Sequence, residues 1–393
     1  MAGSSSAAPL VIQNQVSPDV VVNGPLFYAH TRRQRFPMYP KTKTNWSGGA
    51  DSMQLRQTGI CAGLEVRVSG NVNITGTIGT TTPSYNWPHL VKQFKVSANG
   101  QSNLYNARSV LARALEFTQN TDLNDRGLVK TFATVSQSQG TLALSCDDWG
   151  TNGVNGIWPA TNVVATASYS YDMTYFLPLA ADQVSLIAAV FLQSQQTNIT
   201  LDVAYFSQAE LFTAFGGSAV LDMSQLNIKV TGLVYSIPQV DGKFIIPDLT
   251  QFHGVVENFR MDLGQGVNEP QFAGAGVGRK LLRALFQVNS SSAPLAVTDA
   301  NYTTLGWAYG GNTVPELVAT GGELRAINER QVGCDVGKNW GFGLWDFAGQ
   351  YALRDLVDLG QAPNARLQIG LVSAPTNCQA YITQETLFSG VSA

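Results

Sequence analysis

Apolar residues recur at every second position in many short segments of this chain, and this alternation constrains the fold more than any other feature. The clearest run, Tyr169–Leu177, has an aromatic or apolar residue at every second position and ends at Pro178. Successive side chains of a β-strand point to opposite faces of a sheet, so this pattern is typical of half-buried strands. Similar patterns predict strands at 64–68, 72–74, 94–96, 141–144, 199–205, 226–235, 243–246, 340–345 and 366–372.

Turn-forming pairs such as Asn99-Gly100 and Asp241-Gly242 separate these runs, and helical periodicity is scarce. Two segments, Leu104–Leu115 and Val277–Phe286, carry apolar residues at helical spacing and predict two short amphipathic helices. Many short strands with few helices indicate sandwiches or jelly rolls. The chain has 393 residues, too many for one sandwich. We therefore predict an all-β protein with two jelly-roll β-sandwiches in one chain and a few short helices.

The turn signal at Gln239–Gly242 lies between two predicted strands and is the expected domain boundary. We expect an N-terminal arm at 1–45, a first jelly roll with longer loops at 46–240, a second jelly roll at 241–385 and a C-terminal tail at 386–393. The Gly- and Asn-rich connection at 140–160 is expected to project outward, because loops tolerate length at small entropic cost.

Composition excludes several classes of function. Charged residues make up 13% of the chain, against ~25% in an ordinary soluble domain, and the net charge is −3, so no global basic field exists to hold nucleic acid. The start of the sequence lacks the pattern of a secretory signal, and no apolar stretch reaches the ~20 residues that span a bilayer. We therefore expect reduced, partly buried thiols at four positions with no framework spacing: Cys61, Cys146, Cys334 and Cys378.

Candidate chemical motifs are weak. The glycines of Gly274–Gly278 precede Lys280 and a predicted helix, but the Ser or Thr of a phosphate-binding loop is missing, so a flexible start to that helix is the favoured interpretation. Asp147 and Asp148 stand beside Trp149, yet neighbouring strand residues point to opposite faces. The three histidines are far apart, which argues against zinc. We predict no enzyme activity, no cofactor and no metal site, and a structural role.

A basic stretch near the N-terminus is the one candidate contact site. No carboxylate occurs between Val20 and Ala50, and aromatic residues are interleaved with the cations. The arm either lies along its own domain, touches an anionic surface such as lipid or nucleic acid, or pairs with carboxylates of a neighbouring subunit. Its five cations are Arg32, Arg33, Arg35, Lys41 and Lys43.

Four ordered segments resemble the double jelly-roll major capsid proteins of tailless phages with an internal membrane, the tectivirus type, which are related in fold to adenovirus hexon. They are Met173–Ala180 with the strand that follows, the crossing segment Tyr235–Thr250, the predicted helix Val277–Phe286 and the last strand at Asn364–Gly370. The resemblance covers roughly residues 165–393. The prolines of the N-terminal segment depart from the long helical arm of that family.

The resemblance implies a major capsid protein that forms pseudo-hexagonal homotrimers and tiles an icosahedral virion shell over an internal membrane. It implies upright barrels, termini at the membrane-facing base, and assembly in the host cytoplasm. The expected partners are further copies of the chain, penton or minor capsid proteins, and internal membrane lipids, with no sequence-specific nucleic acid. Two alternatives stay open: a viral spike or receptor-binding β-sandwich protein, and a carbohydrate-active sandwich enzyme with Asp147, Asp148 or Glu257 as acids.

Overall fold

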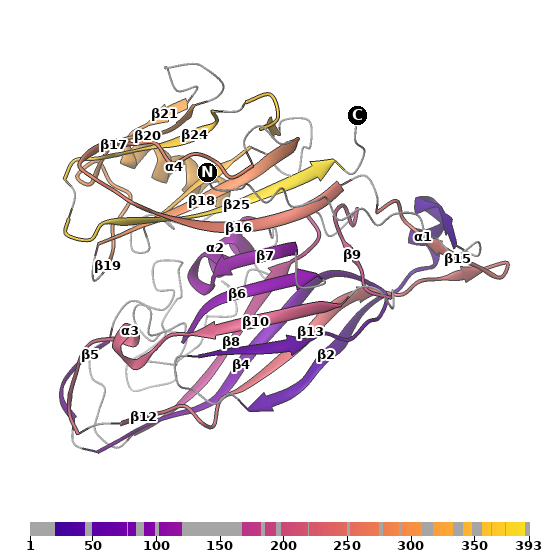
Figure 1. Cartoon of the computed structure of the whole chain (residues 1–393), viewed down its shortest axis with the longest axis horizontal. Helices are drawn as coiled ribbons and strands as arrows, with labels where there is room; N and C mark the ends of the chain where they lie inside the picture. Colours follow the sequence, from indigo (N-terminus) through magenta and orange to yellow (C-terminus); the bar gives the residue numbers. More distant parts are fainter. Residues whose placement is uncertain are drawn as a thin grey trace, which may run out of the picture.

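Two β-sandwiches lie side by side in the chain (Figure 1). The computed structural model describes residues 20–43, 49–76, 78–83, 90–98, 102–119, 167–181, 185–193, 198–218, 220–249, 252–274, 278–290, 293–308, 317–332, 341–347, 356–362, 364–373 and 375–389. The strand predicted at 141–144, the loop at 140–160, the Asp147–Asp148 pair, Cys146 and Cys334 fall outside them.

The first sandwich packs two antiparallel sheets against each other. One sheet runs in the order β8 (Ala167–Pro178), β4 (Ile60–Thr75), β13 (Asn227–Tyr235) and β2 (Arg33–Lys43), with β12 (Val220–Asp222) and β9 (Val190–Phe191) also paired to β4. The other runs β7 (Ser102–Arg108), β6 (Val91–Ala98), β10 (Ile199–Tyr205) and β3 (Ala50–Gln54). A separate pair is formed by β5 (Ile78–Pro83) and β11 (Phe212–Gly217). The two sheets meet where the rings of Phe94 and Tyr175 lie 4.9 Å apart.

The second sandwich repeats this plan. Its first sheet contains β16 (Phe252–Asp262), β25 (Gln379–Ser389) and β18 (Arg279–Ser290), with β19 (Ala293–Pro294), β22 (Phe342–Asp346) and β23 (Val357–Asp358) paired to β18. Its second sheet runs β17 (Gly266–Asn268), β24 (Arg366–Leu371), β20 (Tyr302–Ala308) and β21 (Leu317–Ala319). Phe286 and Ile382 from the first sheet share one core with Leu305 and Ile369 from the second.

Most strands predicted from alternation are present. In β10 the burial of side chains alternates without a break from Ile199 to Tyr205, as a strand between a core and solvent requires. The all-β prediction is confirmed. Residues 33–43, which the sequence placed in an arm, form an edge strand among the described strands of the first sandwich, paired with β13.

The helix predicted at Val277–Phe286 is wrong, because residues 279–290 form the strand β18. Residues 281–289 are buried without interruption. A strand covered on both faces is apolar throughout, and such a run contains helical spacing by coincidence. The glycines at 274–278 therefore precede a strand, and neither interpretation that required a helix there applies.

The described helices are short: α1 (Gly24–His30), α2 (Ser109–Gln119), α3 (Gln208–Leu211) and α4 (Gly321–Val332). The prediction at Leu104–Leu115 is right for its second half only, because β7 continues to Arg108. The helix α4 was not predicted. Among the described residues, no helix has the length and apolar character that crossing a bilayer demands.

The helix α2 lies at the junction of the two sandwiches. Its buried residues Val110, Leu111 and Ala114 pack with Leu285 of β18 and with Phe342 and Leu344 of β22. A single parallel pairing, between Tyr105 of β7 and Val256 of β16, joins the inner sheets of both sandwiches into one ten-stranded sheet. The junction therefore has an apolar interior of its own, in addition to the cores of the two sandwiches.

The chain passes from the first sandwich to the second through strands of a small separate sheet. It contains β1 (Val20–Val22), β15 (Lys243–Ile246) and β14 (Gln239–Val240). The last two form a hairpin whose turn residues, Asp241 and Gly242, both have positive φ, at 50° and 79°. Asp-Gly is the residue pair that such a turn favours. The domain boundary proposed at this turn stays a prediction.

Candidate assembly surface

The strand β2 carries the basic residues that the sequence singled out. It pairs antiparallel with β13, with Arg33 opposite Tyr235 and Arg35 opposite Leu233. Side chains two apart on a strand share a face, and Arg33 and Arg35 are both exposed. The strand thus presents these two cations outward from one face of the sandwich.

The other three cations are placed differently. Arg32 is exposed and precedes β2, where its backbone N–H donates to Ser236 Oγ at 2.9 Å. Lys41 and Lys43 lie in the far part of β2, and the structure describes only their backbone. Four of the five predicted cations therefore lie on the strand β2, and the fifth, Arg32, directly precedes it.

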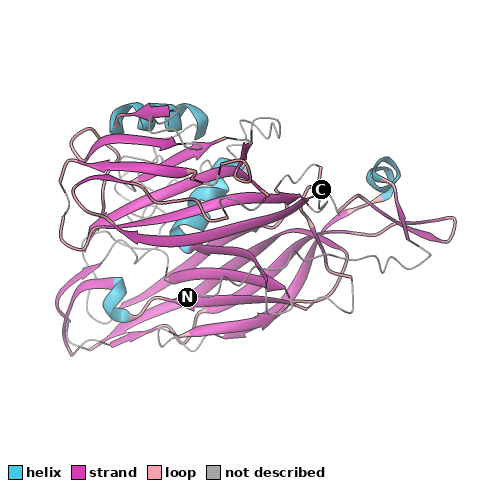
Figure 2. Cartoon of the chain, turned by 45° about the horizontal axis from the view of Figure 1, so that its top comes forward, coloured by secondary structure: helices cyan, strands magenta, loops and turns pink. Residues whose placement is uncertain are grey.

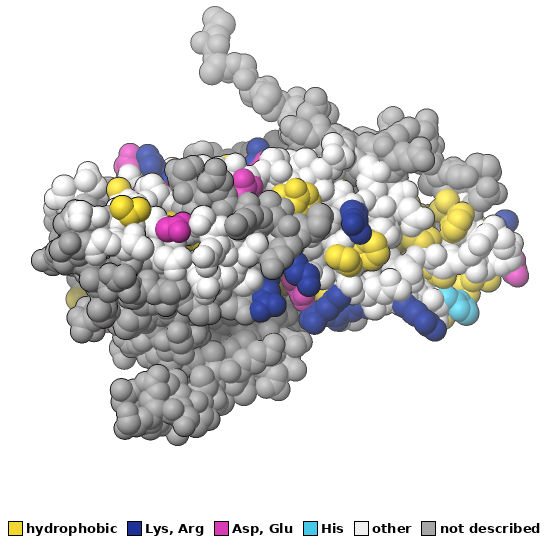
Figure 3. Space-filling view, turned by 90° about the horizontal axis from the view of Figure 1, so that it is seen from below, with side chains coloured by type: hydrophobic (Ala, Val, Ile, Leu, Met, Phe, Trp, Pro, Cys, Tyr) yellow, Lys and Arg dark blue, Asp and Glu magenta, His cyan; other side chains and the backbone are white. Residues whose placement is uncertain are grey.

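The sheet register adds two cations that the sequence analysis missed. Arg35 lies 3.0 Å from Glu65 of β4, which places the outer sides of β2 and β4 on one face. Arg67 follows Glu65 by two residues, and Lys229 of β13 stands directly opposite Arg67. We call the exposed residues Arg33, Arg35, Arg67 and Lys229 the basic face, and Figure 3 looks onto this side of the molecule, where Lys and Arg side chains gather.

Charge on the basic face is unbalanced. The strands β2, β13 and β4 carry six Lys or Arg residues and one carboxylate, Glu65, while β8 on the other side of β4 carries Asp172. Neighbouring strands are ~4.8 Å apart, well inside the ~8 Å Debye length of physiological salt, so these charges act together on a nearby anion. This arrangement favours a partner that supplies negative charge.

A second exposed feature is the unit formed by α1 and the small sheet, which stands away from both sandwiches (Figures 1 and 2). The helix α1 starts at the N-cap Asn23, whose Oδ1 accepts from the Leu26 N–H at 3.0 Å, and it is anchored by the fully buried Phe27. The surface of this unit exposes Val22 of β1, Tyr28 of α1 and Phe244 of β15 by 50%, 45% and 39%. Exposed apolar side chains grouped on a projection are typical of a surface that contacts another molecule.

Of the acids considered for a carbohydrate-active enzyme, the structure describes Glu257, and its carboxylate is engaged in an ion pair. Glu257 of β16 forms an ion pair with Arg279 at 2.6 Å, and the Tyr205 hydroxyl donates to Asp51 Oδ2 at 2.8 Å. Burial, followed by this hydrogen bond and the Asp51 charge, raises the pKa of Tyr205 far above its ordinary value. Within the described ranges, no three His, Cys, Asp or Glu residues gather as metal ligands would.

Two described cysteines are buried thiols, and neither forms a disulfide. Burial raises the pKa of the Cys61 thiol from 9.0 to about 12, although a hydrogen bond with the Gly63 backbone opposes the shift. Burial also raises the pKa of Cys378. Both sulfurs are protonated at neutral pH, which is the unreactive form.

Comparison with known proteins adds the fold class. No protein-family model matches the chain, and no curated protein matches its sequence. Among solved structures, the STIV MCP matches with a TM-score of 0.61 at 14% identity, over 92% of this chain and 96% of that chain. The PBCV-1 virus capsid matches with 0.55 at 12% identity, over 92% and 95%. The Faustovirus major capsid protein matches with 0.54 at 7% identity, over 91% and 89%.

These neighbours are viral major capsid proteins, and the match runs across both sandwiches. At identities this low the likeness establishes the fold alone. The chain has the double jelly-roll fold of viral major capsid proteins, and the fold expected from the four resembling segments is confirmed.

Proposed function

We propose that this chain is the major capsid protein of an icosahedral virus. The observation that carries the proposal is the match to viral capsid structures over more than nine tenths of the chain, with both jelly rolls included. We further propose that it acts as a building block and not as an enzyme, and that it resides in the virion after assembly in the host cytoplasm.

The proposed building block is a homotrimer. Three copies of two similar sandwiches, divided at 46–240 and 241–385, give six barrels and a pseudo-hexagonal footprint that tiles a large shell. A closed trimer needs a heterologous interface that returns on itself after three subunits. Obligate interfaces of this kind bury ~2,000–5,000 Å². The low charge content of the chain supports this, because neutral surface is buried at a smaller desolvation penalty than Lys or Glu.

The first test measures assembly. Sedimentation equilibrium of the purified protein is expected to give about three times the chain mass of 42.2 kDa, and negative-stain microscopy is expected to show pseudo-hexagonal particles that assemble into shells. A well-folded monomer at micromolar concentration contradicts the proposal. Trimers that never form shells, even with penton and minor capsid proteins present, support the spike alternative instead.

The basic face is the proposed contact with a negative partner. One candidate is an internal viral membrane, where each cation near an anionic surface contributes ~1 kcal/mol. The other is the set of carboxylates on a neighbouring subunit. Both predict an interaction that weakens with salt, so the experiment must follow trimer integrity as well as binding.

The second test separates these partners. Anionic liposomes are expected to retain wild-type trimers at low salt and release them at high salt. The triple variant Arg33→Gln, Arg35→Gln, Arg67→Gln is expected to lose retention and stay trimeric, and Arg330→Gln on α4, also exposed, serves as the control. If the triple variant dissociates into monomers, the basic face is a subunit contact and the membrane role fails.

A further inference from the structure

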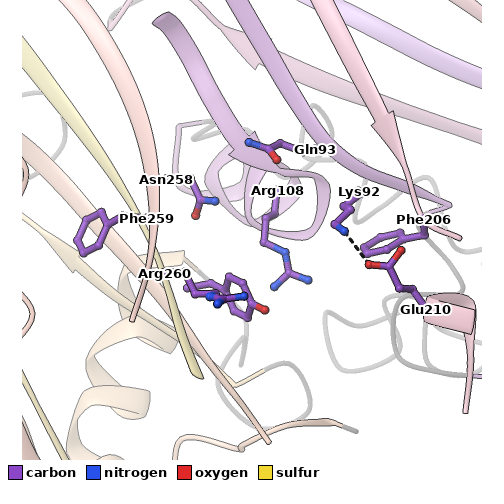
Figure 4. A pocket seen from close by; sticks show the side chains of 9 residues that line it. Lys92, Gln93, Arg108, Phe206, Glu210, Asn258, Phe259 and Arg260 are labelled. Atoms are coloured by element: carbon purple, nitrogen blue, oxygen red, sulfur yellow. Dashed lines mark hydrogen bonds and ion pairs between the residues drawn. The ribbon is translucent and has the colours of Figure 1, made fainter. Parts of the chain in front are cut away.

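A pocket of about 370 Å³ lies between the two sandwiches. The first sandwich contributes side chains from β6, from the last residue of β7 and from the start of α3, and the second contributes side chains from β16 and β25 (Figure 4). Its volume is near the lower end of the range for small-molecule sites. The lining residues used below are Lys92, Arg108, Glu210, Arg260 and Tyr381.

The pocket carries three cations and one carboxylate, and one cation is already neutralised. Lys92 Nζ lies 2.6 Å from Glu210 Oε1, while Glu210 Oε2 accepts from the Ser207 backbone N–H at 2.9 Å and from its hydroxyl at 3.0 Å. Although burial raises it, these hydrogen bonds lower the pKa of Glu210 overall. The carboxylate is therefore ionised and occupied, and the charges of Arg108 and Arg260 remain.

Arg108 is the unusual member of the pocket. Its side chain is 7% exposed, and its guanidinium lies over the ring of Tyr381 with 3.8 Å to the ring centre. Within the described part of the chain, its Nη1 has no hydrogen-bond partner. The Tyr381 hydroxyl donates to Gln379 Oε1 at 2.9 Å, so it does not compensate this charge. A buried guanidinium with an unused donor is unfavourable unless a ligand satisfies it.

Arg260 approaches from the second sandwich. It stands opposite Tyr381 in the pairing of β16 with β25, and its side chain is exposed at the pocket. Both Arg108 and Arg260 line the pocket (Figure 4). Stacking on the Tyr381 ring fixes the plane of the Arg108 guanidinium. A guanidinium held in one plane is suited to bind an oxyanion in bidentate fashion.

We propose that this pocket binds a tetrahedral oxyanion, either free phosphate or the phosphate group of a monoester, through Arg108 and Arg260. Because the two arginines come from different sandwiches, the bound anion links them across the junction. The inference does not depend on the capsid role, and it assigns a ligand site to a surface that the assembly proposal leaves unused.

Calorimetric titration of the intact protein with inorganic phosphate, in chloride buffer of constant ionic strength, is the test. One saturable site per chain is expected. Glycerol phosphate distinguishes a monoester from the free ion, according to which binds more tightly. Arg108→Gln is expected to weaken binding roughly 10–100-fold, the range for a hydrogen bond to a charged group. Arg260→Gln is expected to weaken it less, because that side chain is exposed.

Two further variants protect the conclusion from a folding artefact. Glu210→Gln releases Lys92 and is expected to tighten phosphate binding, which a merely damaged protein does not do. Arg56→Gln removes an exposed arginine outside the pocket and is expected to leave binding unchanged. Absence of saturable binding to wild type overturns the proposal. It is also overturned if Arg108→Gln and Arg260→Gln both bind like wild type, or if Arg56→Gln loses as much affinity as they do.

Discussion

Replacing Arg283 with methionine tests the energetic design of the junction directly. Arg283 is 1% exposed on β18, and its Nη1 lies 2.6 Å from Glu385 Oε2 on β25, which is 4% exposed. On the other side its Nε lies 3.5 Å from Asp346 Oδ1 on β22, which is 14% exposed. One buried cation thus stands between two carboxylates on the flanking strands.

The magnitude follows from these distances. At an effective dielectric constant of ~20, the attraction of Arg283 is about 6 kcal/mol to Glu385 and about 5 kcal/mol to Asp346. Desolvation of the three ions offsets most of this, so the intact group contributes little net stability. Removing the cation breaks both of these ion pairs, and breaking a buried pair costs about 3–5 kcal/mol. We expect Arg283→Met to fall at the upper end of that range.

Calorimetric unfolding at fixed scan rate and protein concentration measures the effect. The entropy of unfolding scales with chain length, and for 393 residues the midpoint shifts by about 1 °C per kcal/mol. Arg283→Met is therefore expected to lower the unfolding midpoint by about 4–6 °C. Glu385→Gln is expected to lower it less, because Arg283 keeps Asp346. The double variant Arg283→Met, Glu385→Leu is expected to recover more than half of the loss, since Asp346 is partly hydrated.

The matched control is Arg35→Met, which breaks an ion pair whose arginine is 70% exposed. Exposed pairs contribute about 0–1 kcal/mol, so its midpoint is expected to shift by about 1 °C or less. If Arg283→Met shifts the midpoint no more than Arg35→Met does, the buried group has no electrostatic role and the reasoning fails.

Two further predictions concern packing and protonation. Leu111→Ala removes a fully buried side chain of α2 from the junction and is expected to destabilise the protein by about 2–5 kcal/mol, read by denaturant unfolding. Because Cys61 has a raised pKa when folded, its contribution to stability is present below pH 9 and is lost as the pH rises toward about 12. Unfolding at pH 8 and pH 10.5 is therefore expected to differ less in Cys61→Ala than in wild type, and an equal difference in both proteins contradicts the assignment.

Alternation in the sequence was enough to predict strands that have one face in a core and one in solvent. Tyr169–Leu177 is contained in β8, and the predicted strand at 199–205 coincides with β10. The alternation pattern failed to predict strands that are buried on both faces. In β18, Leu285 packs against α2 while Phe286 enters the second core, so neither face is polar and the period of two disappears.

The helix α4 escaped prediction for the opposite reason. Its inner face contains Asn328, whose side-chain amide donates to the Leu344 carbonyl at 2.7 Å and whose Oδ1 accepts from the Leu344 N–H at 2.9 Å. Asn328 hydrogen-bonds the backbone of β22 from a position where an amphipathic helix usually has an apolar residue. The apolar helical period is therefore interrupted in the sequence.

Contact residues were predictable only where they are neighbours in the chain. Arg33 and Arg35 could be found from a local charge run, whereas Arg67 and Lys229 join them only through the register of β2, β13 and β4. The same holds for Arg108 and Arg260, which lie on different sandwiches and meet at a pocket that forms when the two pack together. Such sites depend on which strands pair and how the sandwiches pack, and the spacing of residues along the sequence does not determine either.

The junction also bears on why two jelly rolls remain in one chain. Leu285, Phe342 and Leu344 are buried against α2, which belongs to the other sandwich, and Leu282 and Leu387 are buried against Ala181 and Ala188. Separation of the sandwiches would expose this apolar surface and hydrate the Arg283 group at the same time. A shared interior makes the two sandwiches a single rigid unit, because packed interiors have low compressibility.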